Sequence, residues 1–462
     1  MRREWSGSVD LHLDVDPSGG RRAGLERALR EAVRSRRLAP GDAVPSTRAL
    51  AAELGLARGT VSAAYDQLAA EGYFTAVPGG RTRVAAAPAP EPAPAEPAAA
   101  EAPAHDLLPG RPDLSTFPST AWLRSTRRVL ASAPPDVHAL GDPRGRRELR
   151  EALAGYLGRA RGVHADPARI VVTSGYAQSL GLLAAVLRDL GTGAIAMEEP
   201  GHPFHRAIVR RAGLAVVPLP VDERGARPDR LGRAGAAVLT PAHQYPTGAT
   251  LRPDRRRAFA AWARDTGATI VEDDYDGEFR YDRQPVGALQ GTAPDHVVYG
   301  GTTSKTLAPA LRLAWLVLPA HLVEPFAEAK RLADAHTPSL AQLVLADLIG
   351  THAFDRHVRA ARLRYRRRRD LLVETLRDRA PRVRVLGVAA GLHALALLPD
   401  GGQGEGEAMR RAAFHDLALM PLRDHWQDPG ERPQGLVVGY STPVGAAYPA
   451  ALDALCAVLA QA

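Results

Sequence analysis

Apolar residues follow a helical spacing in the first part of the chain. They predict an amphipathic helix over residues 21–37, a second helix that begins after Pro45 with Ser46 as its N-cap, and a third that follows the turn at Gly55. Two short strands around a Gly-Gly turn are expected over residues 73–84. Three helices and a β-hairpin in this order predict a winged helix-turn-helix, whose third helix reads DNA.

The pattern changes in the second part of the chain, where short continuous apolar runs alternate with amphipathic helical stretches. These runs cover residues 169–172, 194–197, 214–217, 237–239, 269–271, 297–299 and 315–318. Continuous apolar runs are typical of strands that are covered on both faces, and helical connections make such strands parallel. The sequence therefore predicts an α/β domain with a mainly parallel sheet.

The segment between these regions, residues 85–104, contains only alanine, proline and glutamate. Such a composition cannot bury enough apolar surface to fold by itself. We therefore expect three parts: a DNA-binding domain over residues 15–84, a linker over 85–104, and a larger domain over 105–462. Two domains also suit the length of 462 residues, since a single core rarely exceeds about 300 residues.

The net charge of +8 comes almost wholly from arginine, because Lys305 and Lys330 are the only lysines. Residues 20–84 hold 11 arginines against 6 acidic residues, which favours a polyanionic partner. A three-helix dimerisation or scaffold module with a solvated arginine face is the alternative interpretation.

One cysteine, no long apolar run and a basic N-terminus without an apolar signal core predict a cytoplasmic protein that has no membrane partner.

Candidate chemistry follows three of the predicted strands. Lys305 lies in a loop of small residues after the run at 297–299, where burial would lower the pKa of the amine and favour a Schiff base. Acidic residues at 272–276 follow another run, and one carboxylate could face the pyridinium nitrogen of pyridoxal 5′-phosphate (PLP). The alternatives are a surface lysine and a Mg²⁺ or Ca²⁺ site. The turn at 173–176 opens a helix whose N-terminus could bind a phosphate.

Motifs at residues 40–51, 54–61 and 68–73 resemble the GntR-type winged helix. The resemblance implies that double-stranded DNA contacts the second and third helices and the wing, through Ser46, Thr47, Arg48, Arg58, Gly59, Thr60, Ser62 and Arg81. Arg58 and Thr60 would enter the major groove, where arginine is the best reader of guanine. Ala57 stands where many relatives have serine or threonine.

Residues 107–460 resemble the fold-type I aminotransferases, which implies a smaller C-terminal subdomain beside the main sheet. The motifs lie at residues 173–180, 198–202, 241–248, 272–279, 300–313 and 391–393. Their particular forms behind a GntR-type domain resemble the MocR subfamily of regulators.

The resemblance implies PLP on Lys305 as a Schiff base, without implying turnover, and implies no metal. Its cofactor-binding residues would be Lys305, Asp273, Tyr275, Gly175, Tyr176, Ala177, His202, Tyr245, Thr302, Ser304 and Arg312. His202 and Leu140 replace tyrosines that are usual in relatives. Residues 436–440 lack the arginine that commonly holds a substrate carboxylate, for which Arg206, Arg359 or Arg432 are possible substitutes.

The sequence thus predicts a PLP-dependent transcription regulator, with an operator DNA partner and an effector that is an amine, an amino acid or PLP. The fold-type I resemblance implies a homodimer. Two alternatives remain: an active aminotransferase with an appended DNA-binding domain, and a repressor whose large domain has lost the cofactor.

Overall fold

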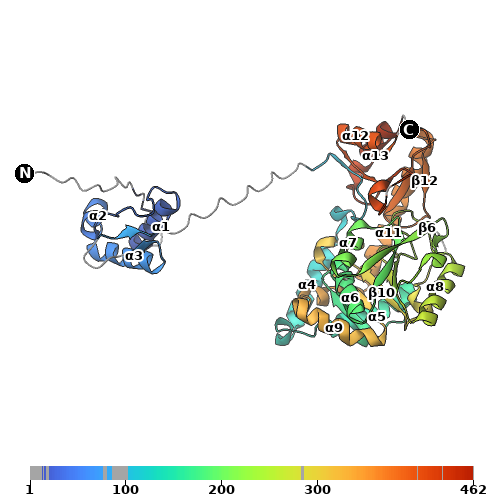
Figure 1. Cartoon of the computed structure of the whole chain (residues 1–462), viewed down its shortest axis with the longest axis horizontal. Helices are drawn as coiled ribbons and strands as arrows, with labels where there is room; N and C mark the ends of the chain where they lie inside the picture. Colours follow the sequence, from blue (N-terminus) through green and yellow to red (C-terminus); the bar gives the residue numbers. More distant parts are fainter. Residues whose placement is uncertain are drawn as a thin grey trace, which may run out of the picture. The chain divides into compact units, whose positions relative to one another are not determined.

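The computed structural model describes residues 13, 15–16, 20–75, 81–85, 102–281, 286–402, 404–428 and 430–460. The chain forms two compact units, residues 1–100 and 101–462 (Figure 1). The predicted linker falls largely outside the described residues, because residues 86–101 are not described.

The first unit contains the three predicted helices and the predicted strand pair. They are α1 (Arg21–Arg34), α2 (Thr47–Leu54), α3 (Arg58–Ala70), β1 (Phe74–Thr75) and β2 (Arg83–Val84). Fully buried leucine and valine side chains from all three helices form the core. The two strands are antiparallel, and the expected turn between them includes residues 76–80, which lie outside the described part.

The ends of these helices follow from local hydrogen bonds. Ser46 caps α2 as predicted, since its hydroxyl accepts a hydrogen bond from the backbone N–H of Ala49 at 3.1 Å. The prediction for α1 was three residues too long. The helix ends at Arg34, where the Ser35 hydroxyl donates to the Glu31 carbonyl and competes with continued helical bonding.

An eight-stranded sheet forms the centre of the second unit. In spatial order its strands are β4 (Ile170–Thr173), β11 (Ala314–Val317), β10 (Val297–Thr302), β9 (Thr269–Asp273), β8 (Ala236–Leu239), β5 (Ala194–Glu199), β6 (Ala215–Asp222) and β7 (Gly225–Ala226). The five strands from β10 to β6 are parallel, which confirms the predicted sheet. Strand β11 is antiparallel to both neighbours, and β7 is antiparallel to β6.

Helices cover both faces of this sheet (Figure 1). One face packs against α6 (Tyr176–Asp189), α7 (Pro203–Arg211) and α9 (Ala320–Asp334). The other packs against α5 (Arg147–Arg161), α8 (Pro253–Thr266), α10 (Ser339–Gly350) and the start of α11 (Ala353–Arg379). A further helix, α4 (Ser119–Ser132), packs on α10. Coverage of both faces is the reason that the strands read as continuous apolar runs.

A smaller antiparallel sheet forms the predicted C-terminal subdomain, in the order β12 (Arg384–Leu386), β13 (His393–Leu397), β16 (Gly435–Gly439) and β15 (Met420–Pro421). Helices α12 (Glu405–Phe414) and α13 (Tyr448–Leu459) pack against it together with α11. Strand β3 (His105–Asp106) pairs with β14 (Leu417–Ala418). The chain therefore enters this unit along the small subdomain. No helix in the described residues is both long and apolar enough to span a bilayer.

Candidate functional site

A cavity of about 350 Å³ lies at the carboxyl ends of β5, β8, β9 and β10. Ligands of open α/β sheets bind at this edge, where the loops after the strands diverge. The predicted residues that line the cavity are Tyr176, Ala177, His202, Tyr245, Asp273, Tyr275, Thr302, Ser304, Lys305 and Arg312. The structure thus brings together residues that are up to 136 positions apart along the chain (Tyr176 and Arg312).

Lys305 and Asp273 face the same cavity from two neighbouring strand ends. Burial lowers the pKa of the Lys305 amine, although the charges of Asp273 and Asp276 oppose this change. Burial also raises the pKa of Asp273 well above its usual range, against the effect of Lys305. The Lys305 Nζ donates a hydrogen bond to the Gly110 carbonyl at 2.5 Å. The neutral amine is the form of lysine that reacts with an aldehyde, and a lowered pKa increases the neutral fraction.

The N-terminus of α6 forms an anion-binding arrangement with Arg312. Gly175 precedes the helix with a φ of 111°, and a Cβ there would lie 2.3 Å from the Arg312 Nη2. Only glycine leaves room for this guanidinium beside the free N–H groups of the first helical turn. A cation next to a helix N-terminus suits a phosphate group.

The residues present fit PLP, as judged by the donors and acceptors around the cavity. Arg312 and the start of α6 suit the phosphate, Lys305 suits the aldehyde, and Asp273 suits the ring nitrogen. The buried hydroxyl of Tyr176 also has no hydrogen-bond partner among the described residues, so it is available to a ligand.

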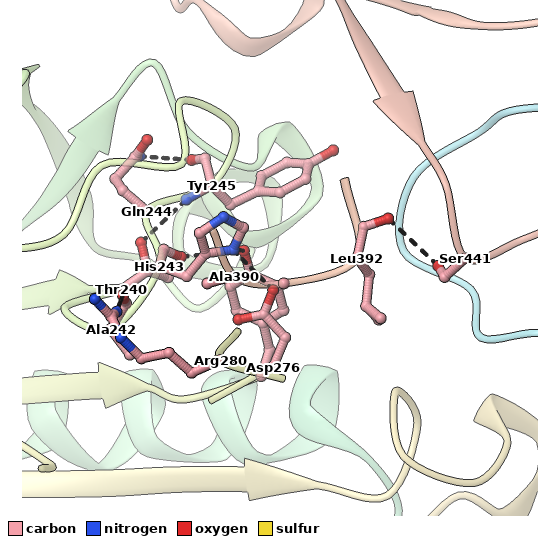
Figure 2. Close-up of polar contacts among 12 residues, drawn as sticks. Thr240, Ala242, His243, Gln244, Tyr245, Asp276, Arg280, Ala390, Leu392 and Ser441 are labelled. Carbon is pink, nitrogen blue, oxygen red and sulfur yellow. Dashed lines mark hydrogen bonds and ion pairs between the residues drawn. The ribbon is translucent and has the colours of Figure 1, made fainter. Parts of the chain in front are cut away.

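A buried hydrogen-bond network supports Tyr275, and Figure 2 shows the contact between His243 and Asp276 that belongs to it. The Tyr275 hydroxyl donates to the His243 carbonyl at 3.1 Å, and the His243 Nδ1 lies 2.9 Å from an Asp276 carboxylate oxygen. Gly391 makes this pair possible, since a Cβ there would lie 2.2 Å from the His243 ring. The potential ligand atoms of His243, Asp276 and His393 lie within 4.8 Å of one another, a grouping that the sequence analysis missed.

Two stacked imidazoles line the wall at the start of α7. His202 stacks on His205 with ring centroids 4.2 Å apart, and on Tyr245 at 5.3 Å. The His205 Nδ1 lies 3.7 Å from an Asp273 oxygen, and burial lowers the pKa of His205 well below its usual range. His205 was not predicted from the sequence. Its spacing of three from His202 was an available signal, because such positions share a helix face.

The three arginines considered as carboxylate ligands lie in different places. Arg206 lines the cavity but is 3% exposed and pairs with Glu199 at 3.2 Å. Arg359 borders a separate cavity beside α5 and α11. The Arg432 guanidinium lies over the Trp426 ring at 4.9 Å, and neither of these two arginines lines the cavity at Lys305.

The predicted DNA-contacting residues lie at the starts of α2 and α3, except Arg81, which lies just before β2. Arg48, Arg58, Gly59 and Arg81 are exposed, whereas Thr47, Thr60 and Ser62 are half-buried. Ser46 is exposed and caps α2. The three arginines form no ion pair with any residue in the described ranges, so their charges are available to a phosphate or a base edge.

Two family models match the chain. The aminotransferase class I and II model matches residues 110–412, and the model of the bacterial regulatory proteins of the gntR family matches residues 22–84. The chain is 33% identical to the pyridoxine biosynthesis transcriptional regulator PdxR of Corynebacterium glutamicum, over 90% of this chain and 91% of that protein. It is 32% identical to the probable rhizopine catabolism regulatory protein MocR of Rhizobium meliloti, over 93% and 92%.

A solved archaeal alanine:glyoxylate aminotransferase has the same fold. It superposes with a TM-score of 0.71 at 23% identity, over 78% of this chain and 91% of that one.

The chain is a DNA-binding transcription regulator whose larger unit has the aminotransferase class I and II fold, and this domain implies PLP as its cofactor. More narrowly, it belongs to the MocR subfamily of GntR-type regulators.

Proposed function

We propose that this chain regulates transcription in response to an amine, an amino acid or PLP that is sensed at Lys305. The observation that carries the proposal is the placement of Lys305, Asp273 and Arg312 around one cavity, with Arg312 against the N-terminus of α6. PLP bound there supplies an electrophilic carbonyl carbon for the amine of Lys305.

Each residue of the cavity has a role toward this cofactor. Arg312 and the N–H groups after Gly175 bind the phosphate, and Asp273 holds a proton on the ring nitrogen. Tyr275 lies near the phenolic oxygen and is held in place by the His243 carbonyl, which accepts its hydrogen bond. Tyr245, Tyr176 and Ala177 border the ring, His202 covers it, and the hydroxyls of Thr302 and Ser304 lie 3.0 Å apart on the phosphate side.

The DNA-binding unit, residues 15–84, reads the operator through the residues at the starts of α2 and α3 and through Arg81. Residues 85–104 then link it to the sensor at 105–462. A homodimer would present two such units to paired half-sites. A cytoplasmic location fits the single cysteine and the DNA partner.

The absorbance spectrum of the purified full chain with added PLP tests the cofactor site. We expect a band near ~410–430 nm from the Schiff base, and we expect Lys305→Ala to lack it. Lys330→Met is the matched control, because Lys330 is the other lysine and does not line the cavity. The Lys330 amine pairs with the Asp334 carboxylate at 2.6 Å. A band that persists in Lys305→Ala, or that is absent from the wild type, would contradict the proposal.

A gel-shift titration tests the DNA-binding role of Arg58. If Arg58 contacts a base edge, Arg58→Ala should weaken operator binding by ~1–3 kcal/mol, which corresponds to roughly fivefold to more than a hundredfold. Arg22→Ala serves as the control, since Arg22 lies on α1 and pairs with Glu26. Equal affinities of Arg58→Ala and the wild type would refute this role.

A further inference from the structure

Three arginines line the cavity at Lys305: two have partners in the structure, and the third is assigned to the cofactor phosphate. Arg206 is held by Glu199 at 3.2 Å and by the His425 carbonyl at 2.9 Å. Arg111 is bonded to the Asp106 carboxylate. Arg312 lies at the start of α6, where the proposed function assigns it to the cofactor phosphate. The described wall therefore offers no further arginine to an anionic ligand.

The imidazoles of the wall do not supply a positive charge either. Burial lowers the pKa of His205 and His393 well below their usual range. The pKa of His202 is lowered to about 4 by desolvation and by the nearby His425, Lys305 and Arg206, although its side chain is partly exposed. The lowered pKa values favour the neutral form of all three imidazoles at pH 7, which donates or accepts hydrogen bonds and forms no ion pair.

The rest of the wall is largely apolar or aromatic. Met420, Leu392, Phe204 and Pro109 border the cavity together with Tyr245. The Tyr245 ring lies against the rings of His202 and His393, with centroids 5.3 and 5.0 Å away. Figure 2 shows Tyr245 next to Gln244 in the same loop. The Tyr245 hydroxyl is engaged by the His425 Nε2 at 3.0 Å. A ligand beside Lys305 therefore meets hydrocarbon and neutral rings, together with the carboxyl groups of Asp273 and Glu198.

We propose that the effector is a primary amine with an apolar or aromatic group and without a carboxylate. This inference rests on the proposed function, since it names the class of amine sensed at Lys305. An amino acid would bring a carboxylate into the cavity, where it would lose hydration without gaining an ion pair. The decarboxylated amine keeps the reactive nitrogen and the apolar contacts and avoids that cost.

Calorimetric titration of the full chain with bound PLP tests this inference with matched ligand pairs. The pairs are 2-phenylethylamine with L-phenylalanine, and 3-methylbutylamine with L-leucine. We expect each amine to bind at least tenfold more tightly than its amino acid. Equal binding, tighter binding of the amino acid, or no binding of any of the four ligands would overturn the inference.

A designed arginine provides the second arm of the test. Met420→Arg adds a cation to the wall and should raise the affinity for L-phenylalanine relative to 2-phenylethylamine by at least tenfold. Leu332→Arg adds the same charge on α9, where Leu332 is 71% exposed and lies outside the cavity, and it should leave the ratio unchanged. An unchanged ratio in Met420→Arg would also count against the inference.

The absorbance band distinguishes a failure of the proposed function from a failure of the inference about the effector. A wild-type chain that lacks the Lys305-dependent band fails the proposed function itself. A chain that shows the band but does not prefer the amines fails only the inference about the effector.

Discussion

Replacing Arg161 by methionine is expected to lower the free energy of unfolding of the large unit by about 3–5 kcal/mol. Arg161 on α5 bonds to both carboxylate oxygens of Asp274, at 2.6 and 3.1 Å, and the two side chains are only 6% and 1% exposed. The Tyr299 hydroxyl also donates to Asp274 at 2.8 Å. Removal of one partner would leave a buried carboxylate without its counter-charge, directly after Asp273.

Urea unfolding followed by tryptophan fluorescence measures this loss, since Trp122, Trp262, Trp315 and Trp426 all lie in the large unit. Arg147→Met removes an exposed pair with Glu151 and should cost less than about 1 kcal/mol. The double variant Arg161→Met, Asp274→Leu should regain most of the lost stability, because both charges are gone. Equal free energies of unfolding for Arg161→Met and Arg147→Met would show that the buried pair stabilises the fold no more than the exposed pair.

Replacing Arg312 by methionine should weaken PLP binding by about 2–3 kcal/mol, which corresponds to roughly thirtyfold to more than a hundredfold. Arg312 adopts a left-handed conformation, with a φ of 52°, which is costly for a residue other than glycine. This conformation places the guanidinium against Gly175 at the start of α6. The phosphate would lose a charged donor pair, while the helix N-terminus would remain.

Titration of PLP into the full chain, followed at the Schiff-base band, measures the effect. Arg312→Lys keeps the charge but loses the two-pronged geometry, so its affinity should fall between those of the wild type and Arg312→Met. Arg312→Gly relieves the backbone strain yet should bind PLP as weakly as Arg312→Met. Wild-type affinity in Arg312→Met would remove Arg312 from the phosphate site.

The sheet was predictable because its strands are buried on both faces, whereas the direction of β11 was not. An apolar run has the same pattern in either direction. The physical signal was the connection: residues 303–313, which include Lys305, contain no helix long enough for a crossover. Parallel neighbours need such a crossover, so β11 returns antiparallel beside β10.

The candidate site likewise contains residues that the sequence predicted and residues that it did not. Lys305, Asp273 and Gly175 were predicted because each belongs to a local pattern at the end of a strand or at the start of a helix. Gly110 and Met420 were missed because they reach the cavity from segments far away in the sequence, through packing of the small subdomain. Single-sequence patterns record which face of an element is buried, but not which distant loop closes over it.

The backbone between residues 105 and 110 joins three parts of the molecule. His105 donates from its N–H to the Asp416 carbonyl at 3.0 Å, the Leu107 carbonyl accepts from Gly439 at 2.8 Å, and the Gly110 carbonyl accepts from Lys305. Five residues can extend over only about 17 Å, and this stretch is fixed at its start, middle and end. These hydrogen bonds connect the segment that leads into the large unit with the small subdomain and with Lys305, so a change at Lys305 would act directly on that segment.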